Sequence, residues 1–345
     1  MNRRMGICPT LILAPMQNVT NLPFWRVLAR RGGPDIYVTE YFRVHVNSCP
    51  EPFIARSIIE NSTGKPVFAQ MIGNDPVHLV RTARELEKLP IAGIDLNLGC
   101  PAPSVCGKQS GGALLRNHER IREIVHSLRE VVTGKVTVKT RIGFEAPGEF
   151  DDLLGLFADL PIDHLAIHGR TVRERYQSQI HTEKIREAVR QLPFPVIANG
   201  NIVSVETAQS IKQLTDAAGL MIGRGAIRNP WLFEQIRQFE SHRPVFRPTL
   251  QDLHSYILEL FDEVASEADN FAEENHVHRM KKYTNYIANG ISGGQFEAQL
   301  RRTRTSAEFH EVCGEHLQSN ELLPDEPTED GKLFCGFSSL LGFAG

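Results

Sequence analysis

The chain has 345 residues, of which 41% are hydrophobic and 23% are charged, with 38 Lys and Arg against 41 Asp and Glu. This ordinary globular composition excludes disorder as the main state, and a formal net charge of −3 excludes a uniformly basic nucleic-acid coat protein. At roughly 150 residues per domain the length suggests about two domains, although a barrel of about 250 residues forms one domain. We therefore expect one large domain followed by a small one.

The six cysteines are scattered, with no CxxC pair and no spacing typical of a metal site. We expect reduced thiols, no metal and no disulfide framework. The N-terminal run MNRRMGICPTLILAPM superficially resembles a signal peptide, but Pro9 and Pro15 interrupt it, which favours a buried strand. No segment has the roughly 18 uncharged apolar residues of a membrane span, so we expect a soluble, cytoplasmic protein.

Eight short apolar runs, rich in β-branched residues, indicate strands in the first two thirds of the chain. They are near-continuously hydrophobic rather than alternating, which is typical of a parallel sheet covered on both faces. The runs span residues 11–14, 36–39, 67–71, 93–98, 136–140, 164–168, 195–199 and 220–223. Helical patterns lie between them at residues 22–31, 77–89, 118–132, 150–160, 183–192, 204–214 and 231–239. This alternation predicts an α/β fold, a closed (β/α)8 TIM barrel.

The barrel is expected to fill residues 1–240 as the catalytic domain. A stretch with two prolines at residues 241–252 indicates a linker, and helical patterns follow at 253–268, 277–289 and 296–303. These patterns predict a small all-α helical domain at residues 250–315. The remaining tail, residues 316–345, is rich in Pro, Asp, Gly and Ser, and the sequence assigns it no role.

Polar residues follow almost every predicted strand, at the end of a TIM barrel where reactive groups gather. The turns ANGN and IGRG after the last two strands are suited to phosphate, because Gly200 and Gly223 let backbone N–H groups approach an anion and Arg224 supplies a countercharge. Each glycine taken singly is explained as well by a tight turn. Two such turns on consecutive strands favour the phosphate site.

Lys139 and Arg141 lie two residues apart in VTVKTR and therefore face the same side of a strand. A lysine inside the mouth needs an anionic or electron-rich partner such as a cofactor, unless it extends to solvent. Cys100 opens a loop rich in Gly and Ser, where it is either a catalytic thiol or an inert buried one, and Cys106 competes for the role. A lone histidine such as His168 is more often a structural group than a catalyst, and only the other polar residues at the mouth favour a functional role.

Eight motifs occur in an order that resembles the signatures of the tRNA-dihydrouridine synthases. They are LAPMQNVT, FAQMIG, GIDLNLGCPAPSV, GGALLRN, VTVKTRIGF, LAIHGRTVRERY, PVIANGNI and GLMIGRGAIRNPWLF. The resemblance runs from residue 11 to about residue 235 and continues more weakly through residues 277–294. Each motif is weak alone, and their order makes the resemblance specific.

The resemblance implies an oxidoreductase that binds FMN, takes electrons from NADPH or NADH, and reduces the C5–C6 double bond of a uridine in tRNA. It implies that hydride reaches C6 from reduced FMN, that Cys100 delivers a proton to C5, and that Lys139 stabilises the reduced flavin near its N1 atom. Asn97 and Arg141 would face the uracil, and Tyr176 would contact RNA together with the helical domain. The other cofactor contacts implied are Pro15, Met16, Gln17, Gln70, His168, Asn199, Gly200, Asn201, Gly223 and Arg224.

Three basic clusters, at residues 170–175, 279–282 and 301–304, are candidates for contact with tRNA, although solvated surface explains each as well. We expect a monomer without a membrane partner, and the uridine position stays open. Two other functions remain: an FMN barrel that oxidises a free pyrimidine, as the dihydroorotate dehydrogenases do, and a tRNA-binding module without catalysis. A helical domain argues against the first, since a free base needs no docking surface.

Overall fold

Eight parallel strands form a closed barrel in the computed structural model, which describes residues 8–267, 272–329 and 332–342. Neighbouring strands follow the order β2, β1, β9, β8, β7, β6, β5 and β4, and pairing of β2 with β4 closes the ring. The short strand β3 (Phe42–Arg43) pairs with the end of β4. The barrel strands are β1 (Thr10–Leu13), β2 (Ile36–Val38), β4 (Val67–Ile72), β5 (Gly93–Leu98), β6 (Lys135–Arg141), β7 (His164–His168), β8 (Val196–Asn199) and β9 (Gly219–Ile222). All eight predicted strands are present, and the predicted TIM barrel is confirmed.

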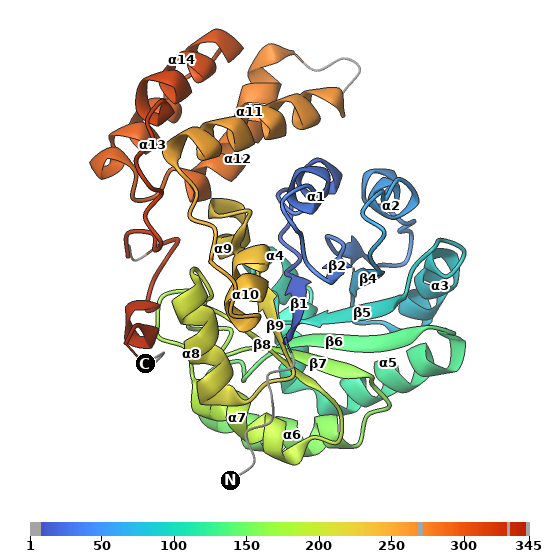
Figure 1. Cartoon of the computed structure of the whole chain (residues 1–345). Coiled ribbons are helices and arrows are strands. Elements are labelled where there is room, and N and C mark those ends of the chain that lie inside the picture. Colours follow the sequence, from blue (N-terminus) through green and yellow to red (C-terminus); the bar gives the residue numbers. More distant parts are fainter. Residues whose placement is uncertain (1–7, 268–271, 330–331, 343–345) are drawn as a thin grey trace.

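The helices that alternate with the strands surround the barrel (Figure 1). The seven predicted helices are present with small shifts of their ends: α1 (Leu22–Ala29), α3 (Pro76–Leu86), α5 (His118–Val131), α6 (Phe150–Ala158), α7 (Thr182–Gln191), α8 (Val205–Thr215) and α10 (Leu232–Glu240). Three further helices were not predicted: α2 (Pro52–Ile59), α4 (Pro103–Cys106) and α9 (Arg224–Arg228). In α2 two large apolar side chains, Phe53 and Ile59, face solvent, so its sequence lacks a clear apolar stripe.

The strands are apolar on both faces because each face packs against a different core. Inward-facing residues form a separate cluster inside the barrel: Ile12, Ala14, Val38, Phe68, Ala166, Ile197 and Met221. Their neighbours along the strands, such as Leu11, Leu13 and Leu165, belong to the core between the barrel and its helices. This double burial explains the near-continuous hydrophobic runs in the sequence.

A helical unit lies at the top of Figure 1, above α1 and α9. It contains α11 (Leu250–Ser266), α12 (Glu273–Ile287), α13 (Gln295–Leu300) and α14 (Ser306–Leu317), of which α14 was not predicted. The Thr249 hydroxyl caps α11 by accepting a hydrogen bond from the Asp252 backbone N–H. The Tyr283 hydroxyl donates to Asn21 Oδ1 at 2.8 Å, which ties α12 to the start of α1. The proposed domain boundaries remain predictions, with α14 crossing the one at residue 315.

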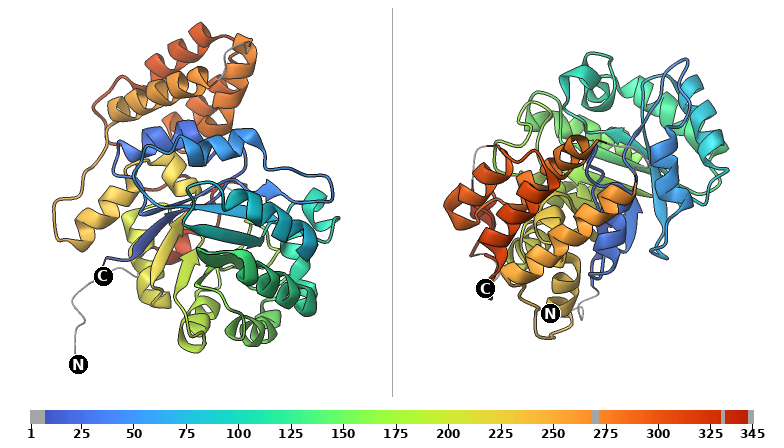
Figure 2. Two further views of the ribbon diagram at one scale, coloured as in Figure 1. Left: turned by 90° about the vertical axis from the view of Figure 1, so that its right-hand side faces the viewer. Right: turned by 90° about the horizontal axis from the view of Figure 1, so that it is seen from above.

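The chain after α14 turns back to the barrel, as the red segment near the label C in Figures 1 and 2 shows. Leu322 forms a β-bridge with Thr249, and the Leu323 backbone N–H donates to the Pro248 carbonyl at 2.8 Å. The final described residues then lie beside α8 (Figure 1). Within the described ranges, no helix combines the length and the hydrophobicity that crossing a bilayer requires.

Candidate active site at the barrel mouth

A cavity of about 600 Å³ opens at the C-terminal ends of the strands. Its volume is within the range of small-molecule and cofactor sites. The predicted site residues that line it are Pro15, Met16, Gln17, Asn97, Cys100, Lys139, Arg141, His168, Tyr176, Asn199, Gly200, Asn201, Gly223 and Arg224. Gln70 is the predicted residue that does not line it. The barrel topology thus brings together residues that are up to about 200 positions apart in the sequence.

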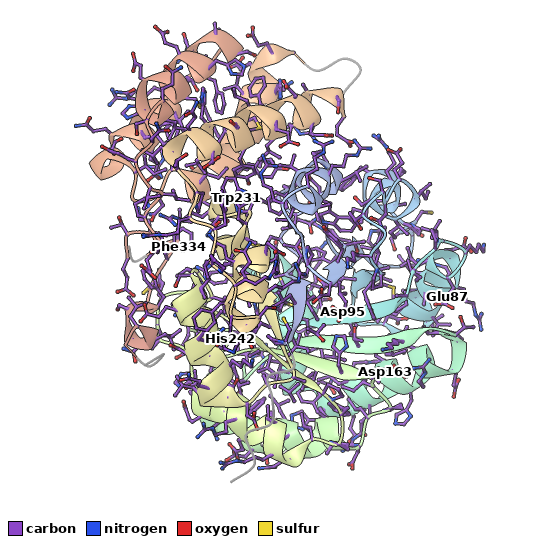
Figure 3. All side chains as sticks on the ribbon, viewed as in Figure 1. Glu87, Asp95, Asp163, Trp231, His242 and Phe334 are labelled. Carbon is purple, nitrogen blue, oxygen red and sulfur yellow. The ribbon has the colours of Figure 1, made fainter. Side chains whose placement is uncertain are left out.

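Gln70 lies behind the cavity in a buried hydrogen-bond network that crosses β4, β5 and β6. Its amide nitrogen donates to Asp95 Oδ2 at 2.7 Å, and its amide oxygen accepts from Asn97 Nδ2 at 2.8 Å. Thr137 Oγ1 donates to the other Asp95 oxygen at 2.6 Å. Sequence reasoning missed Asp95, although its position two residues before Asn97 in an apolar strand indicates an inward carboxylate. Figure 3 labels Asp95 among the barrel strands.

Asn97 sets the position of the candidate thiol. Its side-chain oxygen accepts hydrogen bonds from the backbone N–H groups of Gly99 at 3.0 Å and Cys100 at 2.9 Å. The Cys106 sulfur, in contrast, lies 3.5 Å from the Cys100 carbonyl oxygen, to which it donates, and burial raises the pKa of the Cys106 thiol. Cys106 does not line the cavity, so of the two loop thiols only Cys100 faces it.

Lys139 is a half-buried cation in the floor of the cavity. Its Nζ donates to Asn199 Oδ1 at 3.1 Å, across the barrel from β6 to β8. Burial and the neighbouring charge of Arg141 lower the pKa of Lys139 to about 8, while the carboxylate of Asp95 opposes this shift. The side chain is therefore mostly charged at pH 7.

His168 is a neutral imidazole. Burial lowers its pKa well below the ordinary value, and the charges of Arg141, Lys139 and Arg170 lower it further. Its Nδ1 lies 3.0 Å from Asn199 Oδ1 and its Nε2 lies 3.4 Å from an Arg170 nitrogen. Because Arg170 can only donate, we assign the ring proton to Nδ1.

Tyr176 lies between two guanidinium groups at the rim. The ring centroid is 5.2 Å from the Arg141 guanidinium carbon and 4.8 Å from that of Arg224. Arg141 also donates to three backbone carbonyls, those of Gly99 at 2.9 Å, Thr171 at 2.8 Å and Arg175 at 2.7 Å. Arg141 thereby joins the Cys100 loop to the loop that carries Tyr176.

The ends of β8 and β9 form an electropositive corner with closely packed backbone. Gly200 has φ of +127°, which disfavours any side chain, and a Cβ on Gly225 would lie 2.2 Å from the Ile202 carbonyl oxygen. Arg170 is fully buried here and donates to Asn201 Oδ1 at 3.0 Å. Among the described residues, the buried Asn201 Nδ2 has no protein partner. Arg170 was expected on a surface, and its burial shows that residues 170–175 are not one exposed basic patch.

The other two basic clusters meet on the helical unit. A groove there is lined by His278, Lys281, Arg301, Arg302 and Arg304, among others. Lys281 Nζ donates to the carbonyls of Arg301, at 3.0 Å, and Thr303, which holds the turn after α13 against α12. Sequence reasoning did not single out Tyr41, Tyr286 and Lys332, which also line the mouth. Tyr41 follows the predicted strand at residues 36–39 by two positions, a signal that could have found it, whereas Tyr286 and Lys332 are far from any predicted strand.

Comparison with known protein families shows to which family the chain belongs. The model of the family described as Dihydrouridine synthase (Dus) matches residues 12–322. The chain belongs to the dihydrouridine synthase family. The family recognised from the sequence motifs is therefore confirmed, and the match extends through the helical unit.

Curated relatives agree over most of their length. The chain is 38% identical over 263 residues to a Helicobacter pylori protein named "Probable tRNA-dihydrouridine synthase", covering 74% of this chain and 76% of that one. It is 33% identical to tRNA-dihydrouridine synthase B of Pseudomonas aeruginosa, covering 85% and 88%. It is 32% identical to tRNA-dihydrouridine(16) synthase of Haemophilus ducreyi, covering 81% and 86%. The relative named synthase B and the relative named (16) synthase are thus about equally similar to this chain.

Solved structures support the barrel fold. One is 6-hydroxypseudooxynicotine amine oxidase from Pseudomonas geniculata, with a TM-score of 0.53 and 10% identity over 74% of this chain and 50% of that one. Another is histamine dehydrogenase from a Rhizobium species, with a TM-score of 0.51 and 14% identity over 75% and 50%. At such identity the similarity concerns the fold alone.

Proposed function

We propose that this protein reduces the C5–C6 double bond of a uridine in tRNA, with bound FMN as the redox group and NADPH or NADH as reductant. The observation that carries the proposal is the cavity that presents the Cys100 thiol and the half-buried Lys139 at one mouth, in a member of the dihydrouridine synthase family. A cytoplasmic location and a monomeric state remain predictions.

The residues at the mouth suit a flavin phosphate. The buried Asn201 Nδ2 and Gln17 Oε1 lack protein partners in the described part of the chain, so a donor and an acceptor are available to a ligand. A Cβ on Gly223 would lie 3.1 Å from Met16 Sδ, so the turn before Arg224 is packed too closely to take a larger residue without a shift of Met16. The groups proposed around the phosphate are Gly200, Asn201, Gly223 and Arg224, with Pro15, Met16, Gln17, Lys139 and His168 toward the ring. Asn199 Nδ2 already donates to the Met221 carbonyl at 2.7 Å, so Asn199 would act by orienting Lys139 and His168.

Bound FMN would supply a hydride to uracil C6, which leaves negative charge at C5 and O4. Cys100 then donates its thiol proton to C5, so that hydride and proton together saturate the double bond. Asn97 accepts hydrogen bonds from the backbone N–H groups of Gly99 and Cys100 and thereby holds the turn that carries the thiol. The proton on Lys139 Nζ keeps a positive charge in the floor of the cavity, where it stabilises an anionic flavin ring.

Gln70 and Arg141 would act by positioning. Gln70 joins Asn97 to Asp95 and keeps the Asn97 amide oriented toward the Cys100 turn. Arg141 uses its donors on three backbone carbonyls and packs beside Tyr176, so it would shape the opening that the uracil enters. The uridine must leave the folded tRNA to reach this depth, as base-modifying enzymes generally require.

The groove on the helical unit is the proposed contact for tRNA phosphates. Its cationic residues lie on α12 and in the turn after α13, in the unit that packs above the barrel (Figure 1). Local positive charge attracts a phosphate backbone even when the net charge of the protein is −3.

The test is single-turnover reduction of unmodified tRNA. Purified protein is loaded with FMN, reduced with NADPH, and mixed with tRNA transcript; nucleosides are then analysed by mass spectrometry. We expect FMN reoxidation together with dihydrouridine, and neither product formation nor accelerated reoxidation with free uridine. Turnover of dihydroorotate without dihydrouridine in tRNA would favour the free-pyrimidine alternative, and failure to bind FMN would favour the non-catalytic one.

A further inference from the structure

Residues 332–342, the last described part of the chain, form a C-terminal segment. It is anchored on the barrel and also contacts the helical unit, where the Tyr286 ring of α12 lies 6.5 Å from that of Phe334. Phe334 and Phe337 are buried in a small cluster with Val203 of the turn between β8 and α8. Ser210 Oγ on α8 donates to the Leu340 carbonyl at 2.6 Å, and the Gly342 N–H donates to Glu206 Oε1 at 2.7 Å.

This anchoring brings the C-terminal segment to the electropositive corner of the mouth. Lys332 and Leu333 line the same cavity as Asn201 and Arg224. An Arg224 guanidinium nitrogen donates to the Leu333 carbonyl, and the Phe334 ring centroid lies 5.9 Å from the Arg224 guanidinium carbon. Figure 3 labels Phe334 where the returning chain passes between the helical unit and α8.

A second arginine of the corner is held in the same way. Arg170 Nη2 donates to the Cys335 carbonyl at 2.9 Å and to Asn201 Oδ1 at 3.0 Å. Two guanidinium groups beside the glycine turns therefore take their orientation partly from backbone carbonyls of the C-terminal segment. A carbonyl oxygen orients a guanidinium group but carries no formal charge.

The charges at this corner repel one another. Burial lowers the pKa of Arg170 to about 9, and the charges of Arg224 and Arg141 contribute to the shift. The C-terminal segment brings another cation, Lys332, to the cavity. A group with two negative charges, such as a phosphate monoester, would relieve this repulsion.

We propose that the C-terminal segment is the outer wall of the cofactor site: it orients Arg224 toward the phosphate of FMN, holds the buried Arg170 behind it, brings Lys332 to the same cavity, and slows release of the cofactor. This inference rests on the proposed function and assigns a role to a tail that the sequence motifs leave unexplained. It also predicts that the segment discriminates FMN from riboflavin, which has the same ring and no phosphate.

Flavin titration of a shortened chain tests the proposal. Flavin fluorescence gives Kd and release rate for FMN and riboflavin with the full chain, with residues 1–331, and with a control of residues 1–342 that keeps the whole C-terminal segment. We expect the chain of 1–331 to bind FMN about tenfold more weakly, as expected for loss of charge-assisted hydrogen bonds, and to release it faster. Riboflavin affinity should stay within about twofold, and the control should match the full chain.

Two point variants keep the test decisive if the shortened chain unfolds. Gly336 has φ of +72°, and a Cβ there would lie 2.7 Å from the Ser178 carbonyl oxygen, so Gly336→Ala should displace the C-terminal segment. Lys332→Ala removes the added cation, and Lys65→Ala, at an exposed site, is its matched control. Both test variants should weaken FMN binding at least about threefold and leave riboflavin binding unchanged.

The outcomes separate the two proposals. If the full chain binds FMN and all variants bind it equally well, the C-terminal segment has no role in the site and the inference is overturned while the proposed function stands. Equal losses of FMN and riboflavin affinity also overturn it, because they indicate general loss of structure. A full chain that binds neither flavin contradicts the proposed function itself.

Discussion

The two sides of the barrel mouth are constructed differently. On the β5–β6 side, buried side chains bond to one another and hold the turn that carries Cys100, while Lys139 of β6 donates across the mouth to Asn199 of β8. On the β8–β9 side, glycine turns, guanidinium groups and the returning C-terminal segment form an electropositive wall. Tyr176 lies where the two sides meet.

This difference separates two tasks. The β5–β6 side carries a proton donor and a fixed charge, as a reacting base requires, whereas the β8–β9 side carries groups suited to a phosphate. A substitution on one side should therefore change the rate of uridine reduction, and a substitution on the other should change cofactor affinity. A substitution on the β5–β6 side that changes cofactor affinity, or one on the β8–β9 side that changes the rate of uridine reduction at saturating FMN, would contradict this division.

The largest effect is expected for Cys100→Ala. Removing the proton donor should slow single-turnover reduction of tRNA by at least about 100-fold, the lower end of general-acid effects, while FMN affinity stays within about twofold. Stopped-flow absorbance of flavin reoxidation measures the rate, and Cys106→Ala is the matched control, because its sulfur does not face the cavity. A Cys100→Ala enzyme with the unaltered rate would remove the thiol from the mechanism.

Lys139→Met should reduce the rate by roughly 30-fold, since a charge in a buried site stabilises the anionic flavin more than a hydrogen bond does. Its pKa of about 8 predicts the direction of the pH dependence: the charged form prevails below this value, so activity should fall as pH rises through and beyond 8. The rate is measured from pH 7 to 10.

Lys139→Arg is the matched control for this pH profile, because its guanidinium keeps the charge throughout that range. The variant should lose the decline while retaining more activity than Lys139→Met. An identical decline in all three proteins would show that another group is responsible.

The fold was largely predictable from the sequence because each barrel strand is short, apolar and followed by a polar turn. The two-residue period of side chains along a strand also placed Lys139 and Arg141 on one face. The same reasoning missed the bonds between elements: nothing in the sequence near Gln70 reveals that its amide is taken by Asp95 and Asn97. Arg170 looked like surface charge because its partner Cys335 is 165 residues away.

On the β8–β9 side, Arg224→Ala should weaken FMN binding about tenfold and leave riboflavin binding unchanged, in line with loss of one charge-assisted contact. At saturating FMN the rate of uridine reduction should be restored, which distinguishes this side from the β5–β6 side. Isothermal titration with each flavin measures the affinities. Arg173→Ala, an exposed arginine paired with Glu145, is the control. A lost rate that saturating FMN does not restore would contradict the division of tasks.

The smallest effect is expected outside the mouth, at Arg302 of the groove on the helical unit. Arg302→Ala should weaken tRNA binding roughly threefold and lower the slope of log Kd against log salt by about one, as loss of one phosphate contact does. Arg120→Ala on α5, where the side chain pairs with Glu123 at 2.7 Å, is the control. Binding of labelled tRNA across salt concentrations measures both quantities. FMN affinity and the rate at saturating tRNA should not change, because Arg302 does not line the cavity at the mouth. An altered rate at saturating tRNA would mean that tRNA docking and uridine reduction are coupled through the helical unit.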